Sequence, residues 1–268
     1  MKKWVMIIIG GGSIIIAGLL VALFLNLGSI IKTAVNIYGP EITKTEVRLS
    51  DVDVSLLSGR AEIKGFYLGN PGAFTTPQAI AVASIFIDVE EKSLISDPII
   101  IEKIEIIAPE ITYEKRGRTD NLQTILGNIK ETSGTGKRSG EPGTGETEEG
   151  KKIVIRDVII RDGKVTLATA MLGGAEITVP LPEIRLTNIG QERGGATPVE
   201  AAGEMFAALY AQITAPETMQ ALDSQLKKLE SALDETKKVV TDQATAAGEE
   251  AKQRVKALGD KIKGFLGE

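Results

Sequence analysis

The sequence predicts a mainly β protein with added α-helix: an N-terminal transmembrane helix, an antiparallel β-sheet domain and C-terminal amphipathic helices. Three observations lead to this prediction. An uncharged, mostly apolar run opens the chain, segments rich in Val, Ile and Thr fill its centre, and apolar residues at helical spacing mark its end. With 268 residues the chain is long enough to bury a core of its own.

The uncharged run covers residues 4–31, which is 28 residues. About 20 apolar residues in a helix cross a bilayer core, so residues 1–32 are expected to form a transmembrane helix. A cleaved signal peptide is the alternative, but its apolar region is normally only ~7–15 residues long. No convincing cleavage site follows Leu25. We therefore expect an uncleaved signal anchor, and Lys2 and Lys3 favour a cytoplasmic N-terminus with the bulk of the chain across the membrane.

Residues 41–190 are expected to form the β-rich domain, because short runs of Val, Ile and Thr alternate there with Gly, Pro, Asn and Asp. Pro109 is expected to make a bulge or turn within one of these runs. The spacing of apolar residues in 121–129 predicts a short helix. Strand candidates are residues 52–56, 61–68, 80–89 and 99–113.

An insertion at 131–150 interrupts the β-rich domain. It has almost no apolar residue and is rich in Gly, Ser, Thr and Glu, so burial cannot offset its ordering entropy and a flexible loop is expected. Beyond it, residues 153–167 contain Asp162-Gly163 between two Ile/Val-rich runs, which predicts a hairpin. Further strands are expected at 175–179 and 183–187.

The two parts of the β-rich domain echo each other at an offset of 54 residues. Ile101 then corresponds to Ile155, and Ile104 to Val158. Such a repeat favours one unit, strand–turn–strand, that is used at least twice. Chance similarity between two Ile-rich hairpins is the alternative.

Residues 198–268 are expected to form a helical tail, with Pro198 and Pro216 each at the start of a helix. From residue 222 onward apolar positions recur about every 3.67 residues, the spacing of an eleven-residue repeat. This stripe suits a helix that lies on a partner or on a membrane surface, and a solvated helix is the alternative. The stripe positions proposed for contact are Leu222, Leu226, Leu229, Leu233, Val240, Val255, Leu258, Ile262 and Leu266.

The composition argues against an enzyme. The chain has no Cys and no His, which excludes Ser-His-Asp and Cys-His catalysis, Cys/His zinc sites and thiol redox chemistry. Acidic pairs such as Asp51/Asp53 and Glu90/Glu91 read as solvated strand-edge charges. A net charge of -5 argues against nucleic acid as a partner. No cofactor, catalytic residue or metal site is expected.

An ordered series of segments resembles the AsmA-like family of bacterial envelope proteins. The membrane helix is followed by residues 42–49 and 54–59. The stretch 63–74 comes next; it contains Asn70-Pro71-Gly72-Ala73-Phe74 and looks like the family's "Asn-Pro-x-Gly-Phe" pattern. The same order continues through 87–94, 99–104, 109–111 and 121–126. The resemblance covers residues 1–129, with 153–187 as a continuation.

The resemblance implies an inner-membrane anchor with a periplasmic β-taco or groove that carries lipid. Strands such as 80–89 and 153–160 have apolar residues at both alternating positions, so both faces of the sheet need cover, from acyl chains or from the helices after Pro198. The chain is too short to bridge a periplasm, so a short lipid-binding module of the envelope is favoured. The groove candidates are Ile80, Val82, Phe86, Ile104, Ile106, Val158 and Ile160.

The alternative function is that of a structural or scaffold subunit. In that case the transmembrane and C-terminal helices dock onto other proteins and the β-rich domain is fully packed. The expected partners are membrane lipids, with other envelope proteins or a second copy of the chain as further candidates.

Overall fold

The computed structural model describes residues 26–134, 151–168 and 177–229, together with 231, 235 and 248. It divides into two compact units, Met1–Met219 and Gln220–Glu268, and the sheet belongs to the first. The described ranges contain no helix that is both long and apolar enough to cross a membrane. Most of the predicted anchor and most of the predicted insertion lie outside these ranges.

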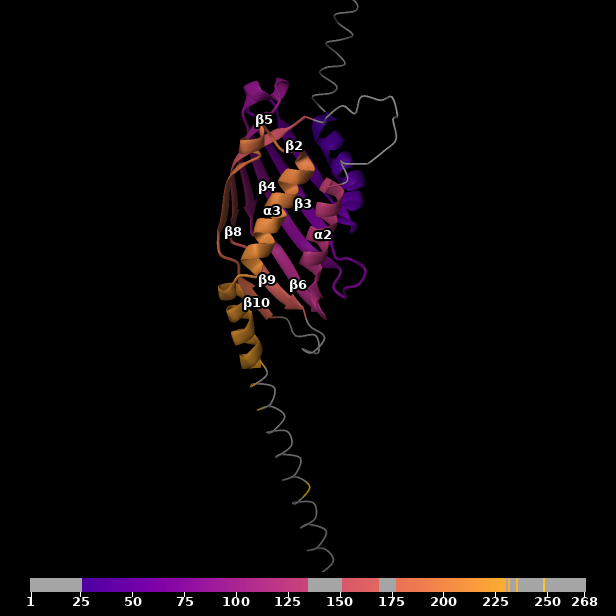
Figure 1. Ribbon diagram of the computed structural model, residues 1–268, viewed down its shortest axis with the longest axis vertical. Helices are drawn as coiled ribbons and strands as arrows, with labels where there is room; N and C mark the ends of the chain where they lie inside the picture. The colour runs from indigo at the N-terminus through magenta and orange to yellow at the C-terminus, as the bar shows by residue number, and fades with distance from the viewer. Residues whose placement is uncertain are drawn as a thin grey trace, which may run out of the picture. The chain divides into compact units, whose positions relative to one another are not determined.

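The centre of the fold is a mixed sheet of eleven strands (Figure 1). Its central order is β10-β9-β6-β4-β5-β8-β11, with β3 beside β4, with β1 and β2 beside β3, and with β7 beside β6. The strands are β1 (Val47–Arg48), β2 (Asp51–Ser55), β3 (Arg60–Gly69), β4 (Gln78–Val89), β5 (Ile99–Ile107), β6 (Glu110–Arg116), β7 (Thr119–Asp120), β8 (Ile153–Arg161), β9 (Lys164–Ala168), β10 (Ile177–Pro180) and β11 (Ile184–Ile189).

Several of these strands are segments of longer ones. β5 and β6 pair with β4 in one antiparallel register from the pair Ile80/Ile111 to the pair Asp88/Lys103, with a one-residue shift only at Val89. β8 pairs with β5, and β9 with β6, in one unbroken parallel register. In both parallel pairs the partner lies 54 residues further along the chain: Ile99 pairs with Ile153 and Glu110 with Lys164. The 54-residue echo in the sequence therefore matches the pairing in the sheet, where the segment β5–β6 lies beside the segment β8–β9 and residues 54 positions apart are partners.

Two expectations about the sheet are wrong. The sheet is mixed rather than antiparallel, because the crossover from β6 to β8 includes a helix, α2 (Asn121–Gly134), and such a connection joins parallel strands. The Asp162-Gly163 pair does not make a hairpin. A two-residue Asp-Gly hairpin turn requires a positive φ at both residues, whereas here only Asp162 has one, at φ 59°. β8 and β9 therefore continue in one direction and pair with neighbouring strands instead of with each other.

A crease crosses the sheet where the long strands are interrupted. Following the registers, it passes through Ser50, Gly65, Ala83, Ala108, Asp162 and Pro182. Three of these six residues have positive φ. At the crease the alternation of side chains shifts by one residue, so that Val82 and Ile85, on one strand, line the same cavity. The sheet thus keeps one apolar face on both sides of the bend.

Ala108 offers a direct test of the crease, because it is a non-glycine residue at φ 49°. Ala108→Gly is expected to raise the free energy of unfolding by about 0.5–1 kcal/mol, since glycine adopts this conformation without steric cost. Ala83→Gly, in the same row but without a positive φ, is the matched control and should lower stability by a similar amount. Urea unfolding measures both, and a loss of stability with Ala108→Gly would contradict this account.

Two helices, α2 and α3 (Pro198–Ile213), lie on one face of the sheet, here called the inner face (Figure 1). α3 begins where Pro198 was expected to start a helix. Its first turn is fixed by a capping box, in which the Thr197 hydroxyl accepts from the Glu200 N–H at 3.3 Å and the Glu200 carboxylate accepts from the Thr197 N–H at 2.8 Å. α3 belongs to the same compact unit as the sheet, so this helix is part of the β-rich unit rather than of a separate tail.

The opposite, outer face of the sheet is largely polar. The Arg185 guanidinium donates two bonds of 2.9 and 2.8 Å to the Asp157 carboxylate, and the Thr166 and Thr178 hydroxyls are 2.9 Å apart. Hydrogen bonds from Arg161 and Lys103 hold the pKa of Glu105 below its ordinary value. Water can cover this face, so the expectation that both faces are apolar does not hold.

The Asn70–Phe74 stretch lies in a loop, and Glu114 of β6 binds the next two residues of this loop, Thr75 and Thr76. Glu114 is buried, and its carboxylate accepts four hydrogen bonds of 2.6–2.9 Å from the N–H and hydroxyl groups of Thr75 and Thr76. Burial raises the pKa of Glu114, but these four hydrogen bonds outweigh it and leave the pKa below its ordinary 4.5.

Because the folded protein prefers the ionised form, Glu114 stabilises the fold above about pH 4.5, and this stabilisation is lost as the pH falls through the lower folded pKa. Glu114→Gln is expected to cost about 2 kcal/mol at pH 7 and much less at pH 3. Urea unfolding at the two pH values checks this. Glu110→Gln, on the same strand but exposed, is the control. Equal losses for Glu114→Gln at both pH values would exclude the ionised carboxylate as the cause.

Candidate functional site

The inner face holds an apolar cavity of about 640 Å³. Its floor is the sheet on both sides of the crease. Ile85, Ile106 and Ile160 form a cross-strand row on one side, and Ile80 and Val82 lie on the other. The remaining floor residues are Val47, Phe66, Leu68 and Pro109.

One wall is the helix of residues 26–43, which lies along the edge formed by β1 and β2. The Asn36 side chain accepts from the Leu49 N–H at 2.7 Å, and Lys32 donates to the Ser50 carbonyl at 2.6 Å. Gly39 permits close packing, because a Cβ there would lie 2.8 Å from the Val47 side chain. The helix thus covers an exposed sheet edge and turns a stripe of apolar residues toward the cavity, namely Ala34, Val35, Tyr38 and Ile42.

The other wall is α3. Its cavity-lining residues recur every three or four positions, as on one face of a helix: Pro198, Val199, Ala202, Met205, Phe206 and Leu209. Tyr38 on the first wall is 59% exposed, and Ala202 on α3 is also exposed. The cavity therefore opens to solvent between the two helices. We call this space, with its sheet floor and two helical walls, the trough.

One end of the trough is closed by α2. The Asn128 side chain donates to the Thr43 carbonyl at 2.8 Å, which ties α2 to the end of the first wall. Ile129 lines the trough and lies close to Gly203 of α3. α2 thus contacts both walls.

At its other end the apolar floor continues beyond the trough. Ile63 pairs with Ile85, and Ala61 pairs with both Ile87 and Val54. These four residues, Val54, Ala61, Ile63 and Ile87, are only half-buried. We call them the apolar strip, and it leads from the trough toward the β2–β3 turn.

The trough contains almost nothing that could bind a polar group. None of the described residues that line it is charged. The Thr43 hydroxyl is engaged with the Gly39 carbonyl at 2.9 Å, and the exposed Tyr38 lies at the opening. A fit to this site therefore requires an apolar ligand, which burial alone would hold.

The groove candidates from the sequence separate into three groups. Ile80, Val82, Ile106 and Ile160 line the trough. Ile104 and Val158 are cross-strand partners and are buried, but they do not line it. Phe86 is 38% exposed and pairs with Glu62 and Glu105 on the outer face, because the crease shifts the alternation after Val82.

The stripe positions proposed for the C-terminal helix fall largely outside the described residues. Residues 216–229 are helical, as expected after Pro216. Leu222 is buried, and Leu226 and Leu229 are half-buried. The positions outside the described residues are Leu233, Val240, Val255, Leu258, Ile262 and Leu266.

Both walls of the trough escaped the sequence analysis as parts of a site. Apolar residues at 34, 35, 38 and 42 continue a helical spacing past Lys32, and this signal would have extended the helix beyond the predicted anchor. The apolar residues at 202, 205, 206 and 209 also have a helical spacing, so α3 carries an apolar face that must pack against another element such as a sheet.

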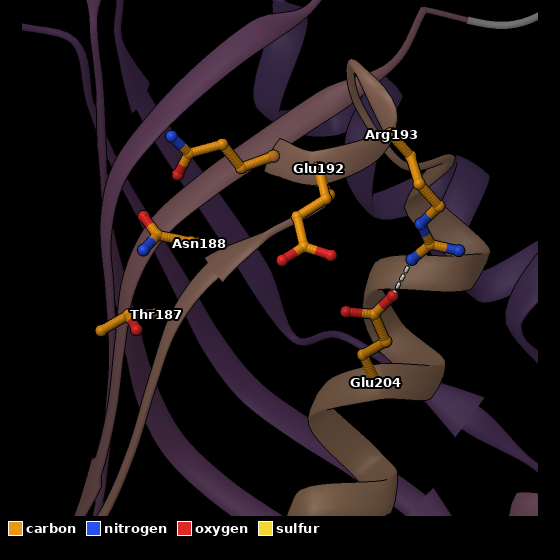
Figure 2. A pocket seen from close by; sticks show the side chains of 7 residues that line it. Thr187, Asn188, Glu192, Arg193 and Glu204 are labelled. Carbon is orange, nitrogen blue, oxygen red and sulfur yellow. Dashed lines mark hydrogen bonds and ion pairs between the residues drawn. The ribbon is translucent and has the colours of Figure 1, made fainter.

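A second hollow, of about 850 Å³, lies between β11, a short helical turn η3 (Gln191–Arg193) and α3 (Figure 2). Thr187, Asn188 and Glu192 line it, and Arg193 forms an ion pair with Glu204 across it. These side chains are exposed. Among the described residues that line this hollow, Arg193 is the one cation, and Glu204 already neutralises it.

One residue of each acidic pair noted in the sequence forms an ion pair. Asp53 lies 2.5 Å from Lys64, and Glu90 lies 3.4 Å from Arg156. Across the described ranges, no three acidic side chains converge in a way that could hold a metal ion.

Comparison with family models, curated proteins and solved structures finds no match to this chain.

Proposed function

We propose that this chain is a membrane-anchored protein that binds the acyl chain of a lipid in the trough. The observation that carries this proposal is an apolar cavity of about 640 Å³ whose described lining residues are all uncharged. The volume falls in the range of small-molecule sites, roughly 300–1,000 Å³. Because the described residues of the trough offer no group that would bind a polar headgroup, we propose that the trough selects for the acyl chain and leaves the headgroup in solvent at the opening.

Energetics favour an occupant. The trough opens to solvent between its two helical walls, so water that fills it lies against apolar side chains and finds almost no polar partners. An acyl chain in the trough would remove this apolar surface from water and supply van der Waals contacts in its place.

The wider role we propose is lipid handling in a bacterial envelope. The uncharged run at residues 4–31 supplies a single-pass anchor, and the lysines before it place the N-terminus in the cytoplasm and the β-rich unit in the periplasm. The resemblance to the AsmA-like family supports the same setting. A short trough suits a module that holds or passes on a lipid rather than a complete bridge.

The test is native mass spectrometry of the full chain, purified in detergent from a bacterial envelope, with lipid extraction from the same sample. The full chain is needed because a shortened chain that begins at residue 40 lacks most of one wall of the trough. The expected result is phospholipid or fatty acid in near-stoichiometric amount. A compact, lipid-free protein that also fails to bind a fluorescent fatty acid would overturn the proposal and leave the scaffold function as the better candidate.

A further inference from the structure

Two aliphatic side chains at loop tips are almost fully exposed. Leu57, in the turn between β2 and β3, is 99% exposed, and Ile95, in the short helical turn η1 (Glu91–Ile95) between β4 and β5, is 92% exposed. Single exposed apolar residues are common on soluble proteins. These two are unusual because each leaves its whole side chain in water and both lie at one end of the sheet.

The two turns are neighbours. The Val89 N–H donates to the Gly59 carbonyl at 2.7 Å, and a Cβ on Gly59 would lie 3.1 Å from the Glu91 side chain. Arg60 and Asp88, the residues that flank the turns on β3 and β4, form an ion pair at 3.5 Å. Leu57 and Ile95 therefore extend from one continuous tip.

The uncharged run joins the described chain at this same end. The helix of residues 26–43 runs antiparallel to β1 and β2, since Asn36 contacts Leu49 and Lys32 contacts Ser50. A Cβ on Gly28 would collide with the Val52 carbonyl, so the start of the helix lies beside β2, on the side of the β2–β3 turn. In Figure 1 this indigo helix begins at the end of the sheet where β2 and β5 are labelled.

We propose that this tip rests on the bilayer that holds the N-terminal anchor, with Leu57 and Ile95 inserted among the lipids. The inference rests on the membrane attachment in the proposed function, but not on an occupied trough. Two aliphatic side chains give only on the order of millimolar affinity by themselves. Tethered by the anchor, they face an effective lipid concentration that is high enough to set the orientation of the domain.

The tip also carries charges of both signs, such as Lys92 and Glu91. The contact is therefore apolar in origin, and we expect it on zwitterionic lipid and at high salt. In this orientation the apolar strip leads from the membrane surface to the open end of the trough.

The chain has no Cys, so a single introduced thiol can carry a fluorescent label at a chosen position. The experiment uses the full chain in phosphatidylcholine vesicles that contain a doxyl-labelled lipid as quencher. The label is placed on Ser58→Cys, at the tip, or on Arg118→Cys, in the exposed turn at the far end of the long strand formed by β5 and β6. We expect the label at 58 to lose at least about half of its fluorescence and the label at 118 to lose almost none.

The side chains themselves are tested with Leu57→Asp and Ile95→Asp together in the Ser58→Cys chain. Both positions are exposed, so folding should be unaffected, and quenching should fall to the level of the label at 118 while the chain still floats with vesicles. Equal quenching at 58 and 118, or quenching that survives both aspartates, would overturn the inference alone. A chain that does not float with vesicles at all would overturn the proposed membrane attachment as well.

Discussion

A charge on the floor of the trough is expected to empty it. Ile106 lies in the cross-strand row between Ile85 and Ile160, at the centre of the floor. Ile106→Glu places a carboxylate where the acyl chain would lie. Because stripping water from a carboxylate is costly, this group stays hydrated and excludes an apolar ligand. We expect at least a tenfold fall in lipid retained per protein, measured by native mass spectrometry and by titration with a fluorescent fatty acid.

The matched control is Ile107→Glu, one residue along the same strand. Ile107 is also half-buried but points to the outer face, where its cross-strand partners are Ser84 and Arg161. A glutamate there joins an existing field of ion pairs and should leave lipid binding unchanged. Urea unfolding of both variants checks that they are folded. If the two variants lose lipid equally, the trough is not the binding site.

Loss of the Asp120 carboxylate is expected to give the largest loss of stability. Asp120 is buried at the start of α2, where its carboxylate accepts hydrogen bonds from the Gln123 N–H at 2.7 Å and the Tyr210 hydroxyl at 2.9 Å. The Tyr113 hydroxyl lies 3.5 Å away. Asp120→Ala leaves these donors without an acceptor and removes the cap of α2, for an expected loss of about 3–4 kcal/mol in urea unfolding.

Tyr210→Phe is the control for that result. It removes only the bond that joins α3 to Asp120 and should cost about 1 kcal/mol.

Burial, together with the Asp120 carboxylate, raises the pKa of both Tyr113 and Tyr210 to about 12. The fold therefore favours neutral tyrosine, and its contribution is complete below pH 10 and is lost as the pH rises from 10 to 12. A loss below about 1 kcal/mol for Asp120→Ala would show that water replaces the carboxylate.

The sequence predicted the kinds of element better than their arrangement. Local signals were sufficient for the strands, for α2 and for the start of α3 at Pro198, because turn residues, caps and periodicity act over a few positions. The direction of β8 was not predicted. Whether a strand pairs parallel or antiparallel depends on the connection between strands, and here α2 makes that connection.

The crease explains why the predicted groove was right at some positions and missed at another. Simple alternation places residues 80, 82 and 86 on one face. The shift after Val82 moves Phe86 to the outer face and brings Ile85 into the trough. The left-handed residues that mark the crease are Gly65, Ala108 and Asp162. Two of the three are not glycine, so composition gave little warning of a bend there.

The common offset of 54 residues has a consequence for how such a chain can change in length. The helix of residues 26–43 covers the edge at β1 and β2, whereas the edge at β10 and β11 is formed by the last strands of the described ranges. One more complete unit, inserted between β8/β9 and β10/β11, would continue the parallel register and the crease and would take over the antiparallel pairing with β10 and β11. Each such unit contributes strands spaced ~4.8 Å apart. The architecture is therefore extensible in one direction only, away from the N-terminus, by increments that preserve an uninterrupted apolar floor.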